Sequence, residues 1–307
     1  MIVTKKPHYD KLQAALENEK LPKEDKPLVE EAIKKYNKWI TDLSECKKLD
    51  SPENVLKKMV QLFNEYKFFI EYNLIFECKN DFLYRQKGQL KLDNSIIEEF
   101  LPYIICPEVI PEISGNSLEV GPTNTFSSIY FTSSLDNLVN GGGLKIRSKD
   151  QDFAISKPLY IMSSFDKDFK DKSISFTNLA YIVAECKTNL DKTMFQEASA
   201  TAHDVKTAVP GAKYFLLCEW LDMTPISTAP TDIDEVIILR KAKRISSNKR
   251  AEFNESKNRE LVKEDYKKFL LDNPISYEMI LRFIEHIKKV INRESLVEDD
   301  VLQNGYF

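Results

Sequence analysis

Hydrophobic side chains recur at helical spacing through the first third of the chain. This pattern, with many lysine and glutamate pairs, predicts helices over 9–20, 27–43 and 52–76. Ser51-Pro52-Glu53 is a typical start for the third of them. Ser95 and Glu98 have the spacing of a capping box before another apolar stretch, which the proline-rich residues 102–111 should end. We therefore expect a mainly helical N-terminal region over 1–115.

The pattern changes to short apolar or alternating runs from Thr125 onward, and such runs are typical of strands. The predicted strands are 126–131, 144–147, 153–162, 179–185, 214–220 and 236–239. A helix should begin at the N-cap Asp191 and end at Pro210-Gly211. Residues 163–178 are polar enough to form a long surface connection. Helices near 261–271 and 276–292 should close the chain.

This order of elements predicts an α/β (α+β) fold, in which a mixed β-sheet is flanked by helices. The catalytic core is expected over 116–245, followed by a helical C-terminal region over 246–307. The chain has 307 residues, of which 42% are hydrophobic, enough for a substantial core. We find no internal repeat. The triplet Gly141-Gly142-Gly143 lacks the Lys-Ser/Thr of a phosphate-binding loop, so nucleotide hydrolysis has no support.

Composition also limits the location of the protein and the kinds of site it can hold. No segment reaches the roughly 20 apolar residues of a membrane span, and the N-terminus lacks the apolar region of a signal peptide. We expect a cytoplasmic protein with no membrane partner. The five cysteines form no CxxC pair, so they and the three histidines predict no zinc site. Reduced thiols are expected.

The strongest chemical signal is Glu185-Cys186-Lys187, which follows the apolar run Leu179–Ala184. Side chains at i and i+2 of a strand point to the same side, so a carboxylate and an ammonium should lie together. That pair suits metal-assisted phosphodiester cleavage, in which an acid holds Mg²⁺ and a lysine stabilises the phosphate or activates a water. The same three letters begin at Glu45 and Glu77, but both stretches have helical patterns around them.

A second carboxylate is required, because Mg²⁺ usually takes one or two protein carboxylates as well as the substrate phosphate. Asp152 is the better candidate, since it lies where a predicted strand begins and could pair with the strand that carries Glu185. Asp150 would lie one pleat earlier on the same face and is the reserve. Either acid, without Glu185, would be read as a solvated residue of a turn.

These residues resemble the core of the PD-(D/E)xK nucleases: Asp152, then Glu185-x-Lys187 at the end of an apolar strand, then a helix with Gln196 in its second turn. The stretch from Lys149 to Thr228, which includes KDQDFAIS and LAYIVAECKTNLDKTMFQEA, is similar to type II restriction endonucleases of the Bpu10I family. The resemblance covers about a quarter of the chain strongly. The family's proline before the first acid is absent, because Gln151 precedes Asp152, so the choice between Asp150 and Asp152 stays open.

The resemblance implies a Mg²⁺-dependent enzyme that cuts double-stranded DNA at a short site similar to CCTNAGC. It implies a dimer, made with a second copy or with a paralogous subunit, and a DNA methyltransferase encoded nearby. Gln196 would support the metal site or contact DNA, and Glu98 would lie near the metal, although a capping role explains Glu98 equally well. His203 is more simply read as a surface residue. The alternatives are a structure-selective repair or recombination nuclease and a non-catalytic DNA-binding module.

The net charge of −4 does not exclude DNA binding, because the positions of the cations decide it. From Arg240 to Arg259 the chain carries eight basic residues and only two acidic ones. Such a segment can contact phosphates or bases, although a solvated basic helix start would look the same. Residues 224–228 (TPIST) are the next candidate for reading bases. The residues predicted to bind DNA are Arg240, Lys241, Lys243, Arg244, Lys249 and Arg250.

Overall fold

A computed structural model of the chain describes residues 5–114, 117–292, 302–303 and 305. The N-terminal region is helical, as predicted, and its third helix continues as a π-helical segment, η1, so that 52–76 is helical throughout. Ser51 caps that helix by accepting a hydrogen bond from the backbone N–H of Asn54. The elements are α1 (Pro7–Leu16), α2 (Lys26–Cys46), α3 (Pro52–Phe68), η1 (Phe69–Phe76), α4 (Phe82–Gln86) and α5 (Ser95–Ile104).

The capping box predicted at the start of α5 is wrong. Ser95 is the first residue of the helix, and its hydroxyl donates to the carbonyl oxygen of Lys91 at 2.6 Å. Glu98 instead accepts from the side-chain amide of Asn94 at 3.1 Å. The helix also continues past Pro102 to Ile104, which the sequence did not predict. A proline in the last turn removes only one backbone hydrogen bond, so the helix tolerates it there.

One five-stranded mixed sheet, in the order β1-β2-β3-β4-β5, forms the centre of the molecule. The first three strands are antiparallel to one another, and β3, β4 and β5 are parallel. The helix α6 (Lys192–Ala208) connects β3 to β4, with Asp191 as its cap. The strands are β1 (Glu119–Phe131), β2 (Leu144–Ser164), β3 (Lys172–Leu190), β4 (Lys213–Leu221) and β5 (Glu235–Lys243).

Two of these strands are much longer than their apolar runs. The predicted strands 144–147 and 153–162 are parts of the single strand β2, and the expected surface connection 163–178 is wrong because β3 already begins at Lys172. β3 also continues beyond Glu185 to Leu190. The extra parts have polar or alternating sequences because they are not buried on both faces.

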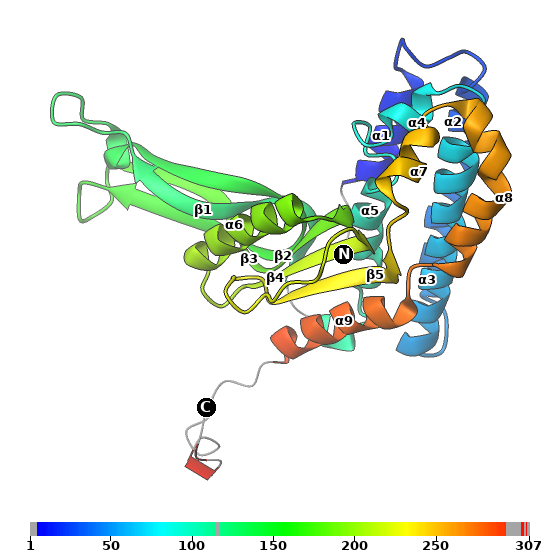
Figure 1. Ribbon diagram of the computed structural model, residues 1–307. Coiled ribbons are helices and arrows are strands. Elements are labelled where there is room, and N and C mark those ends of the chain that lie inside the picture. The colour runs from blue at the N-terminus through cyan, green and yellow to red at the C-terminus, as the bar shows by residue number, and fades with distance from the viewer. Residues whose placement is uncertain (1–4, 115–116, 293–301, 304, 306–307) are drawn as a thin grey trace.

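Helices cover both faces of the sheet where it is widest (Figure 1). α6 packs on one face, through a cluster that includes Val183, Phe195 and Tyr214. The helical N-terminal region and α9 pack on the other, in a larger core that draws residues from all three expected segments of the chain. The last helices are α7 (Ser247–Glu252), α8 (Ser256–Asp272) and α9 (Tyr277–Ile291). The two closing helices that the sequence predicted are thus present, although α8 begins earlier than expected.

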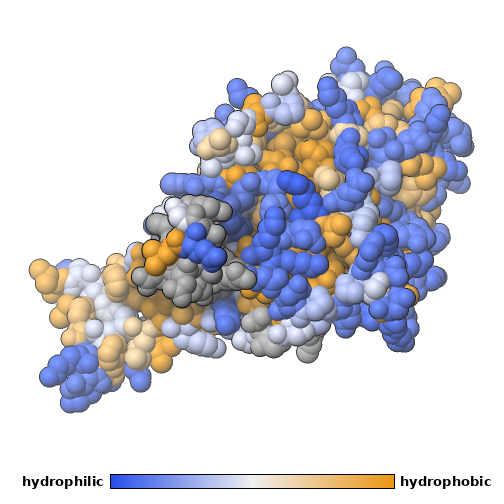
Figure 2. All heavy atoms as spheres, turned by 90° about the horizontal axis from the view of Figure 1, so that it is seen from below, coloured by the Kyte–Doolittle hydropathy of each residue, from blue (hydrophilic) through white to orange (hydrophobic). Residues whose placement is uncertain are grey.

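β1, β2 and β3 extend beyond the helices as a long arm (Figure 1). The first half of β2 pairs with β1, and its second half pairs with the first half of β3, so the arm contains two hairpins. Contacts join them: Ser163 donates to the carbonyl oxygen of Gly141 at 2.8 Å, and Asn178 donates to Thr123 at 3.2 Å. Figure 2 shows apolar residues gathered on the exposed surface of this arm.

Candidate active site

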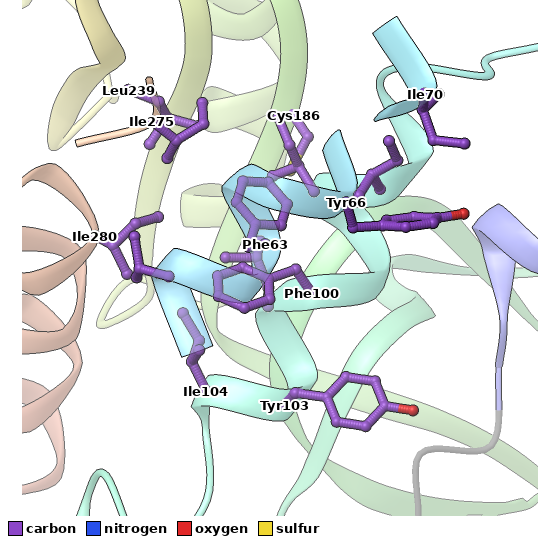
Figure 3. Close-up of a cluster of buried hydrophobic side chains, with 14 of the residues drawn as sticks. Phe63, Tyr66, Ile70, Phe100, Tyr103, Ile104, Cys186, Leu239, Ile275 and Ile280 are labelled. Atoms are coloured by element: carbon purple, nitrogen blue, oxygen red, sulfur yellow. The ribbon is translucent and has the colours of Figure 1, made fainter. Parts of the chain in front are cut away.

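Alternation along β3 places Glu185 and Lys187 on one side of the strand and Cys186 on the other. Figure 3 shows the Cys186 side chain among buried side chains that include Phe63 and Phe100 of the helical region. The burial of Cys186 therefore fixes the register of the strand, and a shift by one residue would reverse the faces. Glu185 and Lys187 form an ion pair, with 2.7 Å between Lys187 Nζ and Glu185 Oε1.

The second carboxylate oxygen of Glu185 is also engaged. It accepts a hydrogen bond from the hydroxyl of Tyr214, the second residue of β4. Tyr214 is fully buried, so its ring cannot move without disturbing the core between α6 and the sheet. The orientation of Glu185 is thus set by two neighbours from different strands.

Asp152 lies beside this pair. Its Oδ2 accepts a hydrogen bond from the backbone N–H of Cys186 at 3.0 Å. Because Cys186 lies between Glu185 and Lys187 in the sequence, this bond holds the Asp152 carboxylate close to both residues. Asp150 is exposed, and its backbone pairs with Asn124 of β1. Asp152 does not begin a strand, as the sequence had suggested, but lies inside β2 next to a register shift between β1 and β2. Bulges of this kind often occur next to active sites, where they change the direction in which a side chain points.

The N-terminal region contributes a second layer to the site. Asn94 donates to the carbonyl oxygen of Cys186 and to Glu98, both at 3.1 Å. Lys91 reaches toward two carboxylates, with its Nζ 3.7 Å from Glu98 and 4.0 Å from Asp152. Glu98 is therefore in the neighbourhood that the resemblance implied.

Burial and mutual repulsion perturb the ionisable groups of the site. Burial raises the pKa of Glu98 to about 7, and the nearby Asp152 carboxylate contributes to the rise. The pKa of Asp152 is raised by burial, although its hydrogen bond from Cys186 opposes the shift. Burial alone would lower the pKa of Lys187, but its contact with Glu185 outweighs burial and raises it. In this arrangement the contact with Glu185 favours the protonated form of Lys187.

Asp152 and Lys187 line one open cleft of about 570 Å³, together with Lys91 and Asn94. Its walls come from the loop before α5, the end of β3 and the helix α7, three segments that are distant in the sequence. Two arginines, Arg244 and Arg250, line the same cleft. The combination of carboxylates, a protonated lysine and further cations suits an anionic substrate such as a phosphodiester.

Comparison with known proteins identifies the family. The sequence model of the Bpu10I restriction endonuclease family matches residues 89–307, well over half of the chain. The chain belongs to the Bpu10I restriction endonuclease family. It is therefore a type II site-specific deoxyribonuclease, as the sequence resemblance had implied.

The fold agrees with that of a solved structure. A structure described as "native BbvCI A2B2 tetramer at low resolution" matches 96% of this chain and 99% of that chain, with a TM-score of 0.63 and 17% sequence identity. This likeness confirms the predicted mixed sheet flanked by helices. None of the curated proteins compared with the chain matches it.

In this family member, the basic segment 240–259 does not form one DNA-facing surface. Arg240 is buried, and its guanidinium donates to Glu219, Glu71 and the carbonyl oxygen of Asn273. Its assignment to DNA binding is wrong, because all three guanidinium nitrogens already donate inside the protein. Arg259 is also buried and binds the carbonyl oxygens of Phe76, Cys78, Asn80 and Phe253.

The other predicted cations lie at the surface or at the cleft. Lys241 is exposed and pairs with Glu278 at 2.8 Å, and Lys243 and Lys249 are exposed as well. Arg244 and Arg250 are partly buried on the cleft, where both approach Asp222, at 3.2 and 3.4 Å. These two arginines are the members of the predicted set that the fold places beside Asp152 and Lys187.

Two other predicted residues lie on α6. Gln196 is exposed on that helix. His203 is largely exposed and pairs with Asp232 at 2.8 Å, in keeping with a surface role. Residues 224–228 form an exposed connection after β4.

Three polar residues of the site escaped the sequence analysis: Lys91, Asn94 and Tyr214. Lys91 has a positive φ of 49°, a conformation that a sequence pattern gives no reason to expect for lysine. Asn94 directly precedes Ser95 and was hidden by the supposed capping box. Tyr214 lies at the start of an apolar strand, where a tyrosine usually indicates a side chain packed in the core. A buried tyrosine hydroxyl needs a hydrogen-bond partner, and this requirement could have indicated a polar neighbour such as Glu185.

The donor set fits a hard divalent cation. Asp152 and Glu185 offer carboxylate oxygens, the ligands that Mg²⁺ prefers. Within the described part of the chain no group of three or more histidine, cysteine or acidic residues could hold a metal by itself. Two carboxylates are nevertheless the usual protein share for Mg²⁺, because waters and substrate phosphate complete its coordination.

Proposed function

We propose that this chain is a Mg²⁺-dependent, sequence-specific DNA endonuclease subunit that hydrolyses phosphodiesters at a short site similar to CCTNAGC, leaving a 5′-phosphate and a 3′-hydroxyl. The observation that carries the proposal is the meeting of Asp152, Glu185 and Lys187, of which Asp152 and Lys187 line one cleft. The acids come from antiparallel neighbours in the sheet, and the hydrogen bond from Cys186 to Asp152 holds them together.

Each residue has a distinct role in this proposal. Asp152 and Glu185 would hold the cation, which when bound supplies Lewis-acid stabilisation of the charge on the scissile phosphate. Lys187 would stabilise the same developing charge through its ammonium, the form that its ion pair with Glu185 favours in the metal-free protein. Activation of a water stays its alternative role. Glu98 and Gln196 remain supporting residues.

Lys187 must also change partners during the reaction cycle. In the structure its Nζ contacts Glu185 Oε1, while Tyr214 holds the other oxygen of the same carboxylate. Both oxygens of Glu185 are therefore committed. We propose that Lys187 leaves Glu185 and turns to the phosphate when the carboxylate binds its cation.

DNA contact is proposed for the cations of the cleft. Arg244, Arg250 and Lys91 line the same cleft as Asp152 and Lys187, so a strand bound in the cleft would meet several positive charges. The exposed residues Lys241, Lys243 and Lys249 can extend this contact along the backbone. Residues 224–228 stay a proposal for reading bases.

One set of acid, acid and lysine cuts one strand, so a double-strand break requires a second set. The solved structure with a similar fold is described as an A2B2 tetramer. We propose that this chain works with a second subunit, a paralogous chain in preference to another copy of itself. A DNA methyltransferase that protects the same site would accompany it.

Digestion of phage DNA with Mg²⁺, followed by sequencing of the ends, tests the function. Discrete ends at one sequence are expected, and random ends would overturn sequence specificity. Glu185→Gln and Lys187→Ala should each abolish nicking of one strand while DNA binding persists, because positioning contacts are spread over many phosphates. If both variants cleave normally, the cleft is not the catalytic site.

A further inference from the structure

Lys91 has a backbone conformation that lysine rarely adopts, and it has it beside the acids of the cleft. Its φ of 49° lies in the left-handed region, which is strained for a residue with a side chain. Such strain persists where the surrounding structure holds it, and it clusters at functional sites. The Nζ of Lys91 is 3.7 Å from Glu98 and 4.0 Å from Asp152, too far for a hydrogen bond to either. The ammonium therefore keeps its donors for a substrate.

Ser95 holds the carbonyl group of Lys91. The Ser95 hydroxyl donates to that oxygen at 2.6 Å, and the Ser95 backbone N–H donates to the same oxygen at 3.2 Å. The N–H of Lys91 donates in turn to the carbonyl oxygen of Gly88, at 3.2 Å. Both polar groups of the Lys91 backbone are thus engaged, while its side chain, 49% exposed, lines the cleft.

A buried histidine continues this set of contacts into the helical region. His8, the second residue of α1, is fully buried, as Ser95 is. Its Nδ1 is 3.0 Å from the hydroxyl of Ser95, and its Nε2 is 2.8 Å from the hydroxyl of Tyr66 on α3. Tyr66, His8, Ser95 and the carbonyl group of Lys91 therefore form one hydrogen-bonded row, which runs from α3 through α1 and α5 to the cleft.

The chemistry of the groups fixes the direction of each hydrogen bond in the row. The carbonyl oxygen of Lys91 can only accept, so the single hydroxyl hydrogen of Ser95 points to it. The Ser95 oxygen must then accept from Nδ1 of His8. Burial, with the charge of Lys67, lowers the pKa of His8 to about 3, so its ring is neutral at pH 7 and carries one proton. That proton is on Nδ1, and Nε2 accepts from Tyr66.

The start of α1 is fastened to α5 by Glu99. The Oε2 of this buried carboxylate accepts from the backbone N–H of His8 at 2.8 Å and from that of Tyr9 at 3.3 Å. Its Oε1 accepts from the hydroxyl of Tyr36. The carboxylate thus satisfies N–H groups that a helix start leaves without a partner. The ring of His8 consequently has a fixed position relative to Ser95, the first residue of α5.

We propose that His8 and Ser95 are positioning residues that hold Lys91 at the cleft, where its ammonium binds a phosphate of the DNA backbone. This inference rests on the proposed function, because it assigns a substrate contact within the same cleft. A lysine on a free loop would lose backbone and side-chain freedom when it binds DNA, whereas a loop that is already held loses less. α1, none of whose residues lines the cleft, therefore contributes to DNA binding through Lys91.

Nitrogen NMR of the full-length protein with labelled histidine tests the row without DNA. The chain has three histidines, and the His8→Gln variant identifies the signals of His8. Neutral histidine in water prefers its proton on Nε2, so a proton on Nδ1 is a specific expectation. We expect the Nδ1–H form throughout the range of about pH 5 to 8, in which an ordinary histidine titrates. A proton on Nε2 would overturn the proposal, because Ser95 would then donate to His8 and not to Lys91.

Duplex binding in metal-free buffer, where cleavage cannot occur, tests the role of Lys91. Measured by fluorescence anisotropy, Lys91→Ala should weaken binding about tenfold, the size of one charge-assisted contact. Ser95→Ala should also weaken binding, but it should add nothing when Lys91 is already alanine. Ser95→Cys, which keeps a weak donor, should recover part of the loss. Equal losses from Ser95→Ala in both backgrounds would overturn the proposal, because the serine would then act on the fold and not through Lys91.

Tyr36→Phe is the matched control. It removes a buried hydroxyl from the same group of helices, but that hydroxyl bonds to Glu99 and lies outside the row, so binding should match that of the wild type. A wild type that binds no duplex would count against the proposed function itself. A wild type that binds and nicks DNA, with Lys91→Ala binding equally well, would overturn this inference alone.

Discussion

β2 and β3 run through two regions of opposite character. At the cleft, the strands carry charged groups that are partly buried and are held by named partners, such as Asp152 by Cys186 and Glu185 by Tyr214. In the arm, the same strands expose apolar side chains such as Tyr160 and Phe176 to solvent. Each region departs from the usual rule that apolar groups are inside and charges outside. The cleft is the region at which we propose that DNA binds.

The two regions differ in how much of the fold depends on them. Behind the cleft, Lys67, Glu71, Glu219 and Arg240 form a buried ionic cluster, with Lys67 Nζ 2.8 Å from Glu219 and Arg240 Nε 3.0 Å from Glu219. It joins α3 and η1 to β4 and β5. Among the described residues, no buried ion pair joins the arm to the helices, and Lys149 of β2 meets Asp204 of α6 at the surface, at 2.9 Å. We expect substitutions near the cleft to affect stability strongly and substitutions of exposed residues on the arm to affect it little.

The largest expected effect comes from breaking the ionic cluster. Arg240→Ala leaves the two buried carboxylates of Glu71 and Glu219 to share one cation, Lys67, and should lower the free energy of unfolding by about 3–5 kcal/mol. Lys243→Ala, an exposed neighbour on β5, and Phe176→Thr on the arm should each change it by about 0.5 kcal/mol or less. Urea unfolding followed by circular dichroism measures all three. Equal losses for Arg240→Ala and Lys243→Ala would show that Arg240 is not buried as described.

The next effect concerns a residue that positions Glu185. Tyr214→Phe removes one hydroxyl and keeps the ring, so the fold should persist. Because the partner groups of metal ligands typically contribute about 10–100-fold to metal affinity or activity, nicking at limiting Mg²⁺ should fall by about this factor. Isothermal titration with Mn²⁺ should show weaker binding. Tyr181→Phe, on the surface of β3, the strand that carries Glu185, is the control, and an unchanged Mn²⁺ affinity in Tyr214→Phe would contradict the positioning role.

A pH effect should distinguish Glu98 from ordinary surface acids. Its pKa rises from the usual 4.5 to about 7 in the folded protein, so between these values the folded state binds the proton more tightly than the unfolded state. The resulting stability is complete below pH 4.5 and is lost as the pH rises through 7. Glu98→Gln should flatten this part of the profile of the metal-free protein, whereas Glu285→Gln at an exposed site should not. Identical profiles for wild type and Glu98→Gln would mean that Glu98 is not held in a protonation-sensitive site.

The smallest expected effect is on DNA binding. Arg250→Gln removes a cation that lies on the cleft, whereas Lys249→Gln removes its exposed neighbour on α7. If Arg250 contacts a phosphate, its loss should reduce the slope of log K against log salt concentration by about one unit. Lys249→Gln should change the slope less. Fluorescence anisotropy with a DNA duplex measures both, and the reverse order would place the DNA along the outside of α7.

The parts of the fold that could be predicted are those in which buried positions recur with the period of a helix or form the apolar run of a buried strand. The helices α2 and α3 and the buried centres of β3 and β4 were correct for this reason. The arm strands escaped because their apolar residues are exposed, as at Ile174 and Phe176, and the polar residues between them resembled a loop. Long-range pairing was also invisible, so Arg240 looked like a DNA-binding cation although its partners are Glu71 and Glu219.

The candidate site was predicted in part for a similar reason. Glu185 and Lys187 follow a buried strand, so their common face could be derived from strand geometry. The proximity of Asp152 depends on the register between β2 and β3, which local sequence does not specify. Lys91, Asn94 and Tyr214 reach the site only through tertiary packing.

The most direct test compares two neighbouring acids of β2. Asp152→Asn should reduce plasmid nicking by about a hundredfold or more, while its DNA affinity stays near that of the wild type. Asp150→Asn, two residues away on an exposed position, should cleave normally. Loss of cleavage in Asp150→Asn with normal cleavage in Asp152→Asn would contradict the assignment of the catalytic centre.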